Sequence, residues 1–331
     1  MFMPRALAAL PVCLTLLTIC LTAQANPQSC ATISNDAARL HCFDSIFKPT
    51  PSNSQGEETL VILNSDSLSE LPPLDSRKIQ ELANTREDFA ITPHKPNYIL
   101  PLSYNASADY SEFGPFEEAF NDTEIKMQLS LKTRIVPNLW GNSSLWIAYT
   151  QQSYWQLYAD SEASAPFRET NHQPEVFWEV PVDFDVLGWN ARIATLAFNH
   201  QSNGRAEPLS RSWNRITGEL TLDRGPFVAS AKSWYRIKED EENDNNPNIE
   251  DFMGRLQLGL AYKRNDHVFA IGLKNNLSSD NRSGLELNWT FPLVQKLRGF
   301  VQIYSGYGEN LIDMENYNNR IGIGIALSDW L

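Results

Sequence analysis

The chain has 331 residues and lacks any long hydrophobic run beyond its first 25 residues. A helix that crosses a bilayer needs about 20 mostly apolar residues, so the remainder of the chain predicts no transmembrane helix. Basic residues are also scarce, since 27 lysines and arginines face 40 aspartates and glutamates, for a net charge of -13. This balance leaves no basic patch to meet phosphates and argues against a nucleic-acid partner.

The one apolar run lies at the start of the chain. Arg5 precedes an apolar segment over residues 6–21, and small residues occupy positions 23 and 25. This order is typical of a signal peptide with its cleavage site, so residues 1–25 are predicted to be removed on export. An uncleaved membrane anchor is the alternative.

Cysteine is scarce too, with four in the chain. Cys13 and Cys20 leave with the predicted signal peptide. Cys30 and Cys42 remain in a chain bound for an oxidising compartment, which favours a Cys30–Cys42 disulfide. A metal site is the less favoured alternative, because His41 is their only nearby partner of a suitable type.

Residues 26–95 are rich in serine, proline, asparagine and acids and show no sustained alternation. They are predicted to form a periplasmic N-terminal extension with one or two short helices, one of them over residues 78–88. The pattern changes near residue 96, and residues 96–331 are predicted to form the main domain.

Alternating hydrophobicity dominates the main domain. In residues 175–186 every even position is apolar and four odd positions are acidic. Successive side chains of a strand point to opposite faces, so this pattern predicts one apolar and one polar face. Residues 125–132, 285–291 and 321–327 alternate in the same way.

About twelve such segments follow one another, each near the ~10 residues that a tilted membrane strand needs. Their connections alternate between short turns and longer loops, as outer-membrane barrels require and β-sandwiches do not. The fold class predicted is therefore all-β, a twelve-stranded antiparallel transmembrane β-barrel. Its strands are expected near residues 96–104, 124–135, 144–154, 175–186, 189–201, 212–222, 226–237, 252–263, 267–276, 284–291, 297–306 and 319–331.

Tryptophan and tyrosine residues occur in and beside the expected strands. A barrel in the outer membrane carries aromatic girdles at both interfaces with water. Taken together, five of these residues are expected to belong to the girdles: Trp146, Tyr149, Tyr154, Trp155 and Trp289.

Three polar side chains break the apolar face of two neighbouring strands. Residues 194, 196 and 198 are apolar, and His200 and Ser202 continue the same parity. Asn214 shares the apolar parity of the next strand, so all three are predicted to emerge on the lipid-facing wall. Polar groups there are costly and indicate function. The alternative is that this end of the wall lies among lipid headgroups, which tolerate polar residues.

These residue types suit nucleophilic catalysis. His200 would take the proton of Ser202 Oγ, the oxygen would attack an ester carbonyl, and Asn214 would hold the imidazole in the required tautomer. A neutral asparagine stabilises an imidazolium less than a carboxylate does, so another positive centre is expected to assist the oxyanion.

Residues 198–205 read FNHQSNGR and residues 210–214 read SRSWN. Both runs resemble the active-site motifs of the outer membrane phospholipase A family, and the resemblance continues in residues 165–171 and 304–309. It covers the barrel but not the N-terminal extension. It implies a calcium-dependent hydrolase of phospholipid and lysophospholipid acyl esters in the bacterial outer membrane, with its active site on the outer-leaflet side.

The resemblance also implies a calcium-linked, reversible homodimer. Calcium (Ca2+) would be held by the Arg205 carbonyl, the Ser210 hydroxyl and Ser164 of the partner subunit. Oxygen ligands of this kind suit a hard cation. Gln151 resembles a family residue at the dimer interface; the alternative is an ordinary lumen or rim residue.

Two other functions stay open at this point. A non-catalytic barrel, such as a porin or a structural anchor, would carry no reactive group on its lipid face. A protease-like hydrolase would act on a soluble substrate, but the chain contains neither a GxSxG nor an HExxH motif. The lipid-facing serine and histidine favour the phospholipase.

Overall fold

A computed structural model describes residues 71–85, 89–240, 242, 244–294, 297–329 and 331. The chain divides into two compact units, Met1–Ile62 and Leu63–Leu331, and every described residue belongs to the second. The predicted signal peptide and the Cys30–Cys42 disulfide lie outside the described residues.

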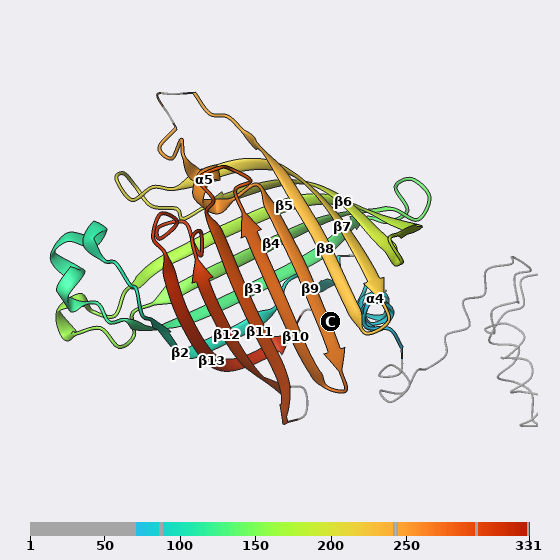
Figure 1. Ribbon diagram of the computed structural model, residues 1–331, viewed down its shortest axis with the longest axis horizontal. Coiled ribbons are helices and arrows are strands. Elements are labelled where there is room, and N and C mark those ends of the chain that lie inside the picture. The colour runs from blue at the N-terminus through green and yellow to red at the C-terminus, as the bar shows by residue number, and fades with distance from the viewer. Residues whose placement is uncertain (1–70, 86–88, 241, 243, 295–296, 330) are drawn as a thin grey trace, which may run out of the picture. The chain divides into compact units, whose positions relative to one another are not determined.

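The second unit is a closed antiparallel barrel of twelve strands, each paired with its neighbours in sequence (Figure 1). Pairing of the first strand with the last closes the ring. The fold predicted from the alternation is confirmed. The strands are β2 (Asn97–Asn105), β3 (Thr123–Val136), β4 (Ser144–Trp155), β5 (Phe167–Val186), β6 (Trp189–Ser202), β7 (Ser212–Arg224), β8 (Phe227–Ile237), β9 (Leu256–Arg264), β10 (His267–Asn275), β11 (Ser283–Val294), β12 (Leu297–Gly306) and β13 (Asn318–Ser328).

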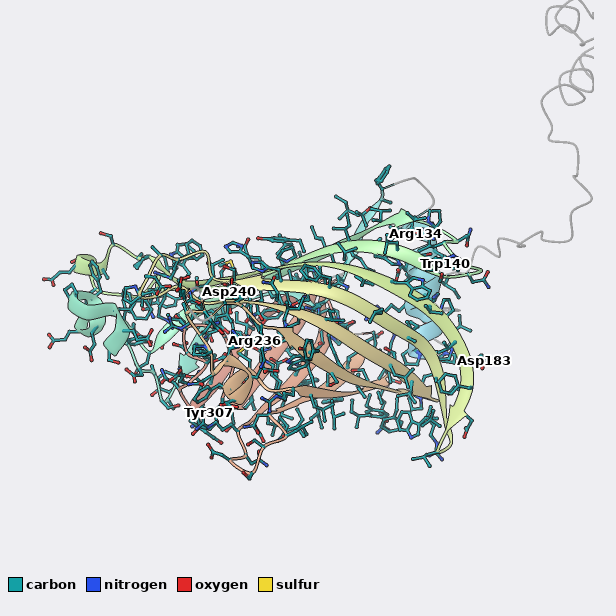
Figure 2. All side chains as sticks on the ribbon, turned by 90° about the horizontal axis from the view of Figure 1, so that it is seen from above. Arg134, Trp140, Asp183, Arg236, Asp240 and Tyr307 are labelled. Atoms are coloured by element: carbon teal, nitrogen blue, oxygen red, sulfur yellow. The ribbon has the colours of Figure 1, made fainter. Side chains whose placement is uncertain are left out.

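The connections differ in length at the two ends of the barrel. Turns such as 187–188 and 225–226 join strands at one end, which we call the turn end. Longer connections lie at the loop end and carry three short helices: η1 (Ser111–Ala119), η2 (Ser161–Ala163) and α5 (Ile249–Met253). Figure 2 shows Trp140 and Asp183 at the turn end and Asp240 and Tyr307 at the loop end.

Two strands begin four or more residues away from their predicted start. β5 begins at Phe167, earlier than the expected residue 175, because its first residues are mostly polar, with buried Arg168 and Glu169 among them, yet still pair with β4. β9 begins at Leu256, later than the expected residue 252. The apolar residues before it belong to α5, whose Ile249 and Met253 are buried one helical turn apart.

At the turn end, helix α4 (Pro73–Asn84) begins and ends earlier than the predicted 78–88. It is held to the barrel by an ion pair of 2.8 Å between Glu81 and Lys132. Strand β1 (Ile91–Pro93) adds to the sheet by pairing with β3. No helix in the described part of the chain is long and apolar enough to cross a membrane.

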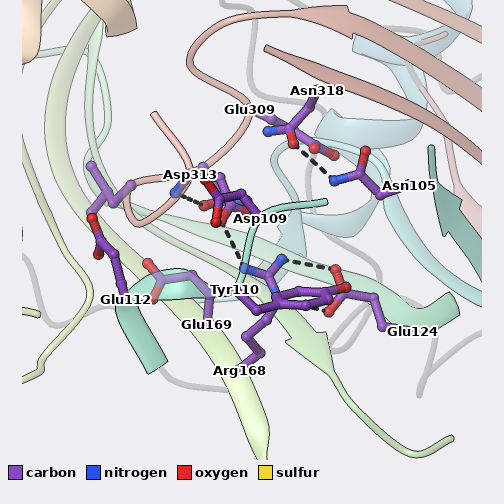
Figure 3. Close-up of polar contacts among 12 residues, drawn as sticks. Asn105, Asp109, Tyr110, Glu112, Glu124, Arg168, Glu169, Glu309, Asp313 and Asn318 are labelled. Atoms are coloured by element: carbon purple, nitrogen blue, oxygen red, sulfur yellow. Dashed lines mark hydrogen bonds and ion pairs between the residues drawn. The ribbon is translucent and has the colours of Figure 1, made fainter. Parts of the chain in front are cut away.

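Ion pairs fill the lumen near the loop end (Figure 3). Glu124 binds Arg168 and Arg320, each at 2.9 Å. Glu309 binds Arg320 at 2.8 Å and Lys126 at 2.9 Å. Burial would raise the pKa of Glu309, but the facing charges of Arg320 and Lys126 outweigh it and lower the pKa to about 2.

Two of the five aromatic residues assigned to the girdles are not there. Trp146 and Tyr154 are buried and face the lumen, where Lys132 Nζ lies 4.4 Å from the centre of the Trp146 ring. The prediction was wrong because it ignored parity: Ile147 and Tyr149 of the same strand face outward, so the even positions of β4 face inward.

Candidate active site

The alternation of β6 places the predicted catalytic residues on the outer wall. Leu196 and Phe198 are 53% and 49% exposed, whereas the neighbouring Ala197 is buried. His200 and Ser202 continue the exposed parity and are half-buried. They lie at the end of β6 where the 203–211 loop begins, which is the loop end of the barrel.

Asn214 of β7 lies directly opposite His200 in the β6–β7 register. His200 Nδ1 is 2.9 Å from Asn214 Oδ1. The Asn214 amide nitrogen donates to Glu239 Oε1 at 3.2 Å. Because a carboxylate only accepts, Glu239 sets the amide with its oxygen toward His200. Nδ1 therefore carries the imidazole proton, and Nε2 of neutral His200 keeps a lone pair.

Ser202 Oγ accepts a hydrogen bond of 3.0 Å from the Gly204 backbone N–H. No hydrogen bond joins Ser202 to His200 among the described residues. Gly204 has φ of +66°, a conformation that favours glycine. An N–H beside the oxygen that attacks is well placed for the oxyanion that follows. Sequence reasoning missed this donor, although the Asn-Gly turn after Ser202 signals it.

Asn203 organises the loop 203–211 between β6 and β7. Its side-chain oxygen accepts from the N–H groups of Arg205 (3.3 Å) and Arg211 (3.0 Å). Its amide nitrogen donates to the Leu209 carbonyl at 2.8 Å. These bonds fold the loop back on its own start, so Arg205 and Ser210 are held in one compact loop directly after Ser202.

The predicted calcium ligands in this loop offer hard oxygens. The Arg205 guanidinium is tied to the Phe167 carbonyl at 3.1 Å, which fixes the residue. Ser210 Oγ accepts from Asn245 Nδ2 at 2.8 Å. The buried Asn245 Oδ1 has no hydrogen-bond partner, so an oxygen is available beside Ser210. A carbonyl, a hydroxyl and an unpaired amide oxygen fit a hard cation such as calcium.

Ser164 lies in the connection between β4 and β5. It is exposed, follows η2 and adopts a left-handed conformation with φ of 53°. No hydrogen bond joins it to Arg205 or Ser210 within the residues that the structure describes. The described residues also contain no cluster of three or more His, Cys, Asp or Glu side chains that could hold a metal.

Comparison with known proteins places the chain in a family. A model of phospholipase A1 matches residues 74–327. Phospholipase A1 of Escherichia coli (strain K12) is 37% identical over 247 residues, which are 73% of this chain and 82% of that protein. The chain belongs to the phospholipase A1 family. Its relatives are outer-membrane phospholipases, so the predicted family, enzyme class and outer-membrane location are confirmed.

Two solved structures of phospholipase A relatives cover most of the chain. An active-site mutant of the Escherichia coli enzyme, with an asparagine changed to alanine, has 34% identity and a TM-score of 0.69. The match covers 75% of this chain and 97% of the mutant's chain. A Salmonella typhi dimer with bound calcium has 33% identity and a TM-score of 0.70, over 76% of this chain and 97% of that chain.

Proposed function

We propose that this family member is a calcium-dependent phospholipase that hydrolyses acyl esters of phospholipids and lysophospholipids from the lipid-facing wall of its barrel. Ser202 is the nucleophile, His200 the base and Asn214 the orienting residue. The observation that carries this proposal is the hydrogen bond between His200 Nδ1 and Asn214 Oδ1 beside Ser202 on the outer wall. A reactive serine in this place meets acyl chains directly.

In the first step His200 Nε2 takes the proton of Ser202 Oγ as this oxygen bonds to the ester carbonyl carbon. The tetrahedral intermediate then collapses, and His200 returns the proton to the departing glycerol oxygen. Water attacks the acyl-enzyme in the same way and releases a fatty acid. Asn214 keeps Nδ1 protonated throughout, so Nε2 can accept the proton both times.

The Gly204 N–H stabilises the oxyanion of each intermediate. The Arg205 carbonyl and the Ser210 hydroxyl would hold calcium, and Ser164 of the partner subunit would complete the site. Calcium when bound would supply positive charge near the oxyanion. A Salmonella typhi relative is a dimer with bound calcium, which supports calcium and a partner subunit in this proposal.

The outer wall also supports the lipid substrate and the dimer. Leu196 and Phe198 continue the face of His200 and Ser202 toward the turn end and offer an apolar surface for an acyl chain. A second subunit against this wall would exclude lipid and water from the cleft. Because the catalytic residues lie at the loop end, they face the outer leaflet.

The test is phospholipid hydrolysis by the purified barrel in detergent, measured as released fatty acid. We expect activity with calcium and its loss with chelator. Ser202→Ala is expected to lower the rate by roughly 1,000-fold or more, as the loss of a catalytic nucleophile does. Ser233→Ala changes an exposed serine of β8 and serves as control. A heat-modifiable gel band shows that each variant is folded, and substantial activity of folded Ser202→Ala would refute the assignment.

A further inference from the structure

A second histidine lies beside the nucleophile, on the side away from Asn214. The register of β5 with β6 pairs His172 directly with Ser202. On β5 the even position 176 is exposed and Phe177 is buried, so His172 faces outward as Ser202 does. Ser202 therefore stands between two imidazoles, that of His200 on its own strand and that of His172 on β5.

The Nδ1 edge of His172 is fixed by a tyrosine. Tyr149 Oη is 2.6 Å from His172 Nδ1, and the two rings stack with centroids 6.2 Å apart. Tyr149 Oη also donates to Gln151 Oε1 at 3.1 Å. The hydroxyl has one proton, and this bond uses it, so His172 Nδ1–H is the donor to Tyr149. Neutral His172 then has a free lone pair on Nε2.

The opposite edge of the His172 ring faces the reaction site. A Cβ added to Gly204 would lie 3.8 Å from His172 Cδ2 and 4.0 Å from Nε2. The same Gly204 donates its N–H to Ser202 Oγ. The Nε2 lone pair of His172 thus borders the space beside Gly204, the proposed oxyanion donor.

From this placement we infer that His172 is a specificity residue for monoacyl phospholipids. Its Nε2 accepts a hydrogen bond from the free glycerol hydroxyl of a lysophospholipid, next to the ester that Ser202 attacks. A diacyl phospholipid has no hydroxyl there. The inference rests on the proposed function, because it requires the ester to lie at Ser202. His172 takes no part in the proton transfers, which belong to His200.

The experiment compares a 1-acyl lysophospholipid with its 2-deoxy analogue, in which hydrogen replaces the free hydroxyl. One hydrogen bond of this kind changes binding by roughly 3- to 10-fold, so wild-type protein should favour the hydroxyl substrate by that ratio in kcat/KM, through KM. His172→Phe should bring the ratio to about one. His267→Phe is the matched control, because it makes the same change at an outward histidine of β10, and it should leave the ratio unchanged.

Tyr149→Phe is a second, milder variant, which frees Nδ1 without removing the imidazole. It should lower the ratio without abolishing it. An unchanged ratio in folded His172→Phe would overturn the inference. Two other results for His172→Phe would also overturn it. A fall of kcat to the level of Ser202→Ala would make His172 the base, and loss of the dimer in sedimentation would make it an interface residue. If Ser202→Ala hydrolysed both substrates, the proposed function itself would fail.

Discussion

At the scale of single residues, the neutral Asn214 is held in place by a charged neighbour. The Glu239 carboxylate accepts from its amide nitrogen, so His200, Asn214 and Glu239 form one hydrogen-bonded chain. Glu239 does not touch the reacting atoms and acts through Asn214. An acceptor-only group at this position prevents the amide from turning its nitrogen toward His200, which would block the required tautomer.

This arrangement predicts a non-additive pair of variants. We expect Glu239→Gln to lower kcat by roughly 3- to 10-fold, the effect of one hydrogen bond to a charged group, with KM unchanged. Asn214→Ala should cost more, but less than Ser202→Ala. In the Asn214→Ala background, Glu239→Gln should have no further effect. Steady-state kinetics of the four proteins measure this coupling.

The control is Glu242→Gln, which changes an exposed acid of the same loop. Independent, additive losses in the double variant would show that Glu239 acts on the fold of the loop and not through Asn214.

Sequence reasoning placed His200 and Ser202 on the outer wall through parity. Because side chains alternate strictly along a strand, the apolar positions before His200 set the face on which it and Ser202 emerge. Glu239 and Gly204 could not be found in this way. Both lie in connections, where no periodicity links a residue to a partner, and the Asn214–Glu239 contact depends on how the 238–255 loop folds.

At the scale of elements, the 203–211 loop joins Ser202, the proposed nucleophile, to the proposed calcium ligands. One side chain, that of Asn203, bonds to the start and the end of the loop. The loop therefore holds Arg205 and Ser210 in one unit with Ser202. We expect calcium affinity to depend on how well this loop is ordered before calcium binds, more than on the stability of the barrel.

Asn203→Ala should raise the calcium concentration for half-maximal activity by roughly tenfold, because the ligands must then be ordered on binding. Thermal stability should change little. Asn276 is a matched control, since it pins the 276–282 loop by bonds to the Asp280 carbonyl and the Arg282 N–H. Asn276→Ala should leave the calcium requirement as it is. Equal calcium titrations of the two variants would contradict the prediction.

The ends of elements were predicted less well than their existence. The first residues of β5 were missed because Arg168 and Glu169 face the lumen as buried charges, and a lumen of ions hides the alternation. The residues before β9 are apolar and look like a strand, but Ile249 and Met253 pack as a helical turn against Trp213 and Trp234.

At the scale of the whole molecule, the buried ion network at the loop end ties strands that lie far apart in sequence. Glu309 joins Arg320 and Lys126. Its pKa in the folded protein is about 2, lowered from 4.5, because the facing cations outweigh burial. A carboxyl with a lowered pKa contributes stability above its unfolded pKa, and this contribution is lost as pH falls toward the folded value.

Glu309→Gln should lower the free energy of unfolding at pH 7 by roughly 3 kcal/mol, because buried Lys126 loses its carboxylate partner and buried Arg320 loses one of its two. The difference from wild type should shrink as the pH falls from about 5 toward 2, where the wild-type carboxyl is protonated too. Urea unfolding in detergent at pH 7 and at a pH near 2 measures the two differences in the free energy of unfolding. Asp280→Asn, which breaks an exposed pair with Arg282, should change stability by less than about 1 kcal/mol at either pH. A pH-independent effect of Glu309→Gln would contradict the charge argument.

The proposed calcium site takes one ligand, Ser164, from the partner subunit. Ser164 is exposed in the connection between β4 and β5. A complementation experiment tests this. The Ser202→Ala subunit lacks a nucleophile but still offers Ser164, whereas the Ser164→Ala subunit keeps its nucleophile but offers no ligand. Homodimers of the first should be inactive, and those of the second should need much more calcium.

In a mixed dimer, the Ser202→Ala subunit would lend its Ser164 to the intact Ser202 site of its partner. Mixing the two variants should therefore restore one complete site per mixed dimer and bring back activity at low calcium. In an equal statistical mixture the activity should reach up to about a quarter of wild type, because half of the dimers are mixed and each of these has one complete site of two. If calcium ligands came from the same subunit as the nucleophile, mixing would restore nothing. Sedimentation of the mixture in calcium and in chelator then links the recovered activity to dimer formation. A Ser164→Ala protein with a wild-type calcium requirement would remove Ser164 from the site while leaving Ser202, His200 and Asn214 in place.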